Sequence, residues 1–161
     1  MNNSTFAYVT YIATTPEKLW EALTNGDFTE KYWFGRKVQS DWTEGAPVTF
    51  RIADGTVAAQ GVVLESEPYR RLSYTFQWPE DRTVRERSTK VTFELQPMEA
   101  AVKLSLKHED LLPTDIRSEH EGFNGINGDG INNGWPVILS GLKSLLESGK
   151  PLSLRTNPTI E

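Results

Sequence analysis

The chain has 161 residues, a formal net charge of −5 and no cysteine, and 37% of its residues are hydrophobic. This length and composition predict one globular domain, which we place at residues 1–150, with a flexible tail at 151–161. The acidic balance argues against nucleic acid as a partner, the lack of cysteine excludes disulfides and thiolate metal sites, and neither a secretory signal nor a membrane span is found, so we expect a cytoplasmic protein.

The first elements are a strand over 6–12, rich in aromatic and β-branched residues, and a helix that Thr15 caps and Pro16 opens. The helix ends at Asn25-Gly26. The sequence Asp27-Phe28-Thr29-Glu30 then resembles a capping box that opens a second short helix. On the first helix, the spacing predicts a buried side made of Leu19, Trp20 and Leu23.

Six further strands are predicted, separated by residues typical of turns, over 37–42, 47–53, 56–66, 71–78, 88–96 and 101–108. Asp54-Gly55 is the strongest hairpin signal and predicts a tight primed turn. Connections this short require antiparallel pairing, because parallel strands need long crossovers.

A segment rich in glycine and asparagine covers residues 112–134, and we interpret it as a hinge or an entrance lid. One amphipathic helix follows, with apolar residues at Trp135, Ile138, Leu139, Leu142, Leu145 and Leu146. It ends at Gly149 and Pro151, and its start has two interpretations. Either Trp135 caps it, or it begins near Asp129 and kinks at Pro136. Strands with helices at both ends indicate an α+β fold, in which the sheet is the apolar partner of this helix.

Four stretches of the chain resemble one known family. They are residues 12–24, Tyr32-Trp33-Phe34-Gly35, Val91–Leu95 with Leu106–Glu109, and Gly134-Trp135-Pro136 with the helix behind it. They are similar to the START-like, helix-grip superfamily, and in particular to the bacterial branch named after the activator of heat-shock-protein-90 ATPase. The resemblance implies a seven-stranded curved antiparallel sheet wrapped around the long C-terminal helix, with two short helices after the first strand.

This resemblance also implies a cavity between sheet and helix that binds a small apolar molecule, such as a lipid, a polyketide or a flavonoid. A cyclase or hydrolase using the same cavity is the alternative, and a chaperone partner is suggested by the name of the branch. A homodimer is a further expectation. We expect neither a cofactor nor a metal site, since no spaced ligand pair occurs and Gly128-Asp129-Gly130 matches the dinucleotide fingerprint imperfectly.

The candidate cavity residues are mostly aromatic. Trp33 and Phe34 stand at a helix-to-strand junction, Phe76 and Trp78 share one strand face, and Trp135 stands where the long helix meets the glycine-rich segment. Leu139 and Leu142 complete the set from the helix. Strand alternation places His108 on the face of Leu104 and Leu106, where a structural role, a ligand contact and a general base are all open. His120 is interpreted as a solvated loop residue, and no catalytic residue is assigned.

Overall fold

The computed structural model describes residues 4–79, 87–112 and 131–152. Their elements in chain order are β1 (Ser4–Ile12), α1 (Pro16–Thr24), α2 (Gly26–Tyr32), β2 (Lys37–Gln39), β3 (Pro47–Arg51), β4 (Val57–Glu67), β5 (Arg71–Phe76), β6 (Thr89–Pro97), β7 (Val102–Leu111) and α4 (Ile131–Ser148). The predictions for the glycine-rich segment at 113–130, for His120 and for the tail at 153–161 lie outside the described residues.

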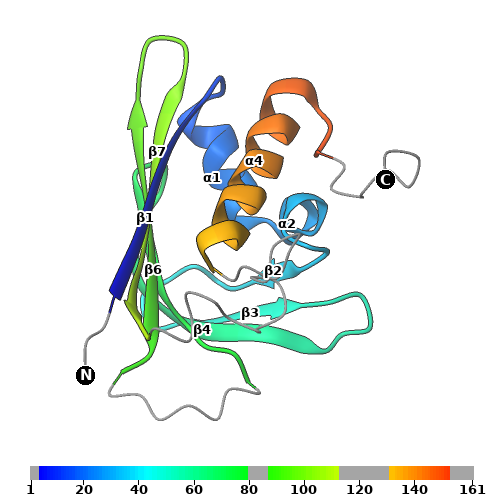
Figure 1. Cartoon of the computed structure of the whole chain (residues 1–161), viewed down its shortest axis with the longest axis vertical. Coiled ribbons are helices and arrows are strands. Elements are labelled where there is room, and N and C mark those ends of the chain that lie inside the picture. Colours follow the sequence, from blue (N-terminus) through cyan, green and yellow to red (C-terminus); the bar gives the residue numbers. More distant parts are fainter. Residues whose placement is uncertain (1–3, 80–86, 113–130, 153–161) are drawn as a thin grey trace.

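The strands form one seven-stranded sheet in the order β1-β7-β6-β5-β4-β3-β2, and every neighbouring pair is antiparallel. In Figure 1, β1, β6 and β7 run upright while β3 and β4 run crosswise beneath them, so the sheet curves around α4. α1 and α2 lie on the same side of the sheet as α4. The predicted α+β helix-grip fold is confirmed.

The apolar stripe of α4 forms the centre of the core. Trp135, Ile138, Leu139 and Leu142 are fully buried, and Leu145 is nearly so. Each such side chain contributes about 1.5–3 kcal/mol relative to an exposed one. The opposite wall of the core is the inward face of the strands, where every second residue is apolar.

The first helices follow the predicted capping chemistry with two corrections. The Thr15 hydroxyl accepts the N–H of Lys18 at 3.2 Å, as the cap prediction requires. The capping box at Asp27 is wrong: Asn25 caps α2, because its side-chain oxygen already accepts the N–H of Asp27 at 2.9 Å. Trp20 is only half-buried, and Ala22 takes its predicted place on the buried face of α1.

The Asp54-Gly55 hairpin is present, but the primed turn is wrong. The Gly55 N–H donates to the carbonyl of Ile52 at 2.9 Å, and only Gly55 of the turn has a positive φ, at 89°. A two-residue primed turn of the expected type needs positive φ at both central residues. The loop is longer instead, and the β3–β4 register shifts between Phe50 and Arg51.

α4 begins at Ile131 and contains Pro136, so Trp135 is not its cap. The alternative start near Asp129 is closer to the structure. Pro136 lies in the second turn, where its missing N–H costs one intrahelical hydrogen bond. Trp135, buried one residue earlier, holds this turn against the sheet through its hydrogen bond to His108.

Candidate functional site

A chain of buried hydrogen bonds links α4 to three strands. The indole Nε1–H of Trp135 donates to Nδ1 of His108 at 3.0 Å. Nε2 of His108 lies 2.9 Å from the hydroxyl of Thr89, and that hydroxyl donates to the carbonyl of Phe76 at 2.5 Å. Each of these four residues comes from a different element: α4, β7, β6 and β5.

The directions of these bonds fix the state of the imidazole. An indole N–H is only a donor, so Nδ1 of His108 must be the acceptor, and the ring proton sits on Nε2. Nε2–H then donates to Thr89, whose own proton goes to Phe76. Both ring nitrogens of His108 are thus engaged by protein groups, and neither is open to take a proton from a bound molecule. This arrangement weakens the general-base interpretation of His108.

Five aromatic side chains surround this hydrogen-bond chain, and we call them the aromatic cluster: Trp33, Phe50, Phe76, Trp78 and Trp135. The ring centroids of Trp33 lie 4.8 Å from Phe50 and 5.1 Å from Trp135. Phe76 lies 5.4 Å from Trp78, and its ring meets that of His108 edge-on at 5.7 Å. These are the tilted and edge-to-face contacts that aromatic quadrupoles favour.

The structure brings together five of the eight predicted cavity residues. Trp33, Phe76, Trp78, His108 and Trp135 are buried and form ring contacts with one another. Leu139 and Leu142 are buried further along α4. Phe34 is only half-buried and has a left-handed φ of 49°, in the tight connection between α2 and β2.

Three participants were not predicted. Phe50 and Phe93 contact Trp33 and Trp135, respectively. Both residues alternate with buried apolar neighbours in their strands, and this alternation in the sequence could have predicted that they face the core. Thr89 carried no signal, because a threonine in a strand is ordinary and its contact with His108 spans 19 residues of sequence.

Burial also dominates the electrostatics of two tyrosines in the same core. It raises the pKa of Tyr32, whose hydroxyl donates to the carbonyl of Ala22 at 2.8 Å. It likewise raises the pKa of Tyr74, with a smaller contribution from the nearby Tyr32. Both phenols therefore stay neutral.

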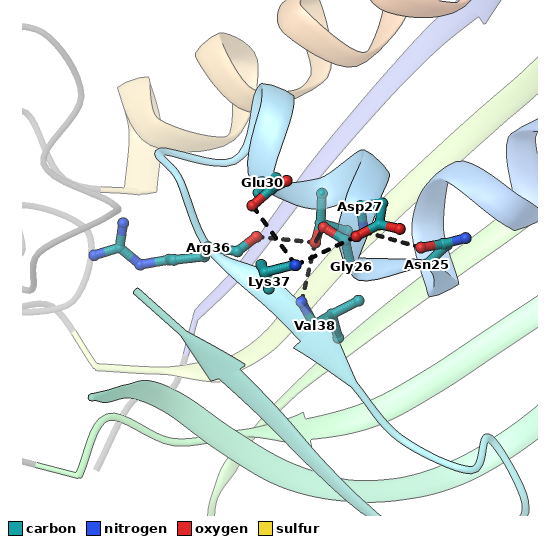
Figure 2. A network of polar contacts seen from close by, with 8 residues as sticks. Asn25, Gly26, Asp27, Glu30, Arg36, Lys37 and Val38 are labelled. Atoms are coloured by element: carbon teal, nitrogen blue, oxygen red, sulfur yellow. Dashed lines mark hydrogen bonds and ion pairs between the residues drawn. The ribbon is translucent and has the colours of Figure 1, made fainter. Parts of the chain in front are cut away.

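A hollow lies on the surface between the start of α2 and the β3–β4 turn, with a volume of about 640 Å³. Figure 2 shows its charged side: the Lys37 ammonium lies 3.3 Å from Asp27 and 4.0 Å from Glu30. These side chains are largely exposed and already paired with one another, so we do not treat this cleft as the binding site.

No group of His, Asp and Glu side chains within residues 4–79, 87–112 and 131–152 is placed to hold a metal ion. Among the helices so described, none combines the length and hydropathy needed to cross a bilayer.

The sequence matches the model of the family described as Activator of Hsp90 ATPase homolog 1-like protein over residues 13–147. A comparison with curated proteins gave no match. Protein MLL2253 from Mesorhizobium loti is 27% identical, with 89% of this chain and 96% of that chain covered and a TM-score of 0.70. ChR145 from Cytophaga hutchinsonii is 26% identical over 91% and 96%, with a TM-score of 0.67.

The Aha1 dimer from Colwellia psychrerythraea has the same fold, with 22% identity, 91% and 98% coverage and a TM-score of 0.69. The helix-grip architecture and a family match across most of the chain agree. The chain therefore belongs to the family of Activator of Hsp90 ATPase homolog 1-like proteins.

Proposed function

We propose that this protein binds a small, apolar, ring-containing molecule between the sheet and α4, at the aromatic cluster. The observation that carries the proposal is the cluster itself, which gathers around a buried polar chain. Aromatic walls with a few fixed polar groups are the usual composition of small-molecule sites.

The side chains of the aromatic cluster favour a planar aromatic ligand over a flexible acyl chain. Rings in edge-to-face and tilted contact suit a planar aromatic molecule, such as a flavonoid or an aromatic polyketide, better than a flexible acyl chain. The hydroxyl oxygen of Thr89 keeps one acceptor lone pair beside its bonds to His108 and Phe76, and it is the polar group to which a ligand hydroxyl would donate. A ligand that buries about 300 Å² of apolar surface gains roughly 7 kcal/mol.

The rings of the cluster are in contact, so a ligand must displace at least one of them. Moving a ring lowers the net gain, and we expect dissociation constants in the micromolar range rather than the nanomolar range. Displacement also changes the surroundings of Trp33 and Trp135, which makes tryptophan fluorescence a direct reporter.

The test is a thermal-shift and fluorescence titration with a flavonoid, an anthraquinone and a long-chain fatty acid. We expect the two aromatic ligands to raise Tm with increasing concentration and to quench fluorescence, and the fatty acid to do so more weakly. Phe76→Leu should lose most of this effect, because it removes a central ring while keeping apolar bulk. Trp20→Leu, a half-buried ring outside the cluster, is the matched control and should keep it. Absence of any shift with all three ligands contradicts the proposal.

A further inference from the structure

The two edges of the sheet are built differently. The β2 edge is only three residues long and is covered by α2. The hydroxyl of Thr29 accepts the N–H of Val38 at 3.0 Å and donates to the carbonyl of Arg36 at 2.9 Å, contacts drawn in Figure 2. Short length, a helix cover and the charged Lys37 are all devices that prevent another strand from adding to an edge.

The β1 edge has almost none of these devices. β1 has nine residues, Ser-Thr-Phe-Ala-Tyr-Val-Thr-Tyr-Ile, without one charged residue or proline. It is the outermost strand beside β7. An edge of this length and composition is a template for strand addition.

The register shows which backbone groups of β1 face outward. At the β6–β7 turn, the N–H of Met98 donates to the carbonyl of Ala101, which makes these two residues a hydrogen-bonded pair. Hydrogen-bonded and non-hydrogen-bonded pairs alternate along an antiparallel ladder, so the next hydrogen-bonded pair is Gln96–Lys103, and every second pair after it is of the same kind. The other residues of β7 turn their backbone groups toward β1 and form its hydrogen-bonded pairs. These pairs are Val102–Ile12, Leu104–Thr10, Leu106–Tyr8 and His108–Phe6. The N–H and C=O groups of Ala7, Val9 and Tyr11 consequently point to the open side.

α4 covers one end of this edge. Nζ of Lys143 donates to the carbonyl of Tyr11 at 2.6 Å, and the N–H of Ala13 donates to the carboxylate of Glu147 at 2.9 Å. Among the described residues, no segment lies beside Ala7 and Val9 in the same way. The open stretch thus runs from the start of β1 to Val9.

Two aromatic rings border the open stretch. Phe6 and Tyr8 point to the inner face, are half-buried, and stack on each other with centroids 6.4 Å apart and an interplanar angle of 10°. Val9 is 48% exposed on the outer face. An incoming strand would cover apolar side chains on both faces as well as pair the backbone.

We infer that β1 pairs antiparallel with β1 of a second copy of this chain, about a two-fold axis at Ala7. In this register Ala7 faces Ala7, and Thr5 faces Val9, as hydrogen-bonded pairs; Phe6 faces Tyr8 as a closely spaced pair. The cross-strand aromatic and β-branched pairs are favourable, and the uncharged strand brings no like charges together. A second copy fits this edge because the strand complements itself. The inference is independent of the proposed ligand.

The first test is the mass of the protein across a dilution series, by sedimentation or light scattering. The monomer mass is 18.2 kDa, and we expect twice this value at the concentrated end. Ala7→Pro should leave a monomer, because it removes an outward N–H that has no partner among the described residues. Ala7→Lys should do the same by placing two charges opposite each other. Val62→Lys, at an exposed position on the non-edge strand β4, is the matched control and should stay dimeric.

The second test fixes the register and uses the absence of cysteine from the chain. In the dimer, Cα atoms of the facing Ala7 residues lie about 5.5 Å apart, within the roughly 4.4–6.8 Å that a disulfide needs. Ala7→Cys should therefore cross-link on oxidation. Val9→Cys should not, because its own copy lies four residues away along the strand, about 13 Å. A wild-type protein that is monomeric throughout, a dimeric Ala7→Pro variant, or equal cross-linking of both cysteine variants overturns the inference.

Discussion

At the scale of single residues, His108 shows what pattern alone can predict. Alternation along its strand placed it on the interior face, and it is fully buried there. Its partners could not be read from the sequence, because Trp135 and Thr89 reach it through packing and strand register. The histidine was predicted, and the network that fixes its proton was not.

Thr89 is the residue on which this network depends most. Thr89→Val keeps the shape but leaves Nε2–H of His108 and the carbonyl of Phe76 without this partner, and we expect a loss of about 2–3 kcal/mol in the free energy of unfolding. Thr89→Ser keeps the hydroxyl and loses one methyl, which should cost about 1 kcal/mol. Urea unfolding of the two variants measures the difference, and equal losses would show that the hydroxyl contributes nothing.

At the scale of elements, the attachment of α4 to β1 has an electrostatic part. Glu147 accepts the N–H of Ala13 and an ammonium hydrogen bond from Lys143 at 2.6 Å. The backbone bond first, and then Lys143, hold the pKa of the Glu147 carboxyl below its usual range. A carboxyl with a lowered folded-state pKa adds stability above its unfolded pKa, near 4.3, and loses it as pH falls through the folded value.

Glu147→Gln should therefore lower Tm at neutral pH, and the gap from wild type should close as the pH falls below about 4. Measuring Tm against pH for both proteins tests this. Glu99→Gln, in the exposed β6–β7 turn, is the control for a simple loss of charge. A gap that stays constant down to acid pH would contradict the role of the carboxylate.

The close approach of β4 to β5 depends on Gly61. A Cβ atom at Gly61 would lie 1.7 Å from the carbonyl oxygen of Thr75 on the neighbouring strand, so β4 and β5 approach too closely there for any side chain. We expect Gly61→Ala to cost about 3 kcal/mol through overpacking. Gly55→Ala, at a positive φ but in open space, should cost only about 1 kcal/mol. Thermal unfolding ranks the two, and the reverse order would contradict the close approach.

At the scale of the whole molecule, the sequence was sufficient for the class of fold. Turn residues separated the strands, and the one long apolar stripe identified α4 as the element that the sheet surrounds. Boundaries were less accurate where tertiary contacts decide. The 37–42 strand ends at Gln39, and α4 starts before Pro136 because buried Trp135 holds that turn in place.

The whole fold should respond to the centre of α4. Leu142 is fully buried, and Leu142→Ala should cost about 2–5 kcal/mol through lost burial and the cavity left behind. Leu152→Ala, at a half-exposed position beyond the helix, should change stability by no more than about 0.5 kcal/mol. Circular dichroism and tryptophan fluorescence should give one coincident transition for Leu142→Ala. Separate transitions would mean that α4 and the sheet unfold independently.

The Thr29 hydroxyl at the β2 edge limits how many copies of the chain can join. In the proposed dimer, the two β1 strands meet at the centre, and the outermost strands are the two β2 strands. Thr29 already occupies backbone groups there, so neither end of the joined sheets accepts another strand. Growth stops at two copies, and the protein forms a closed pair rather than a fibre.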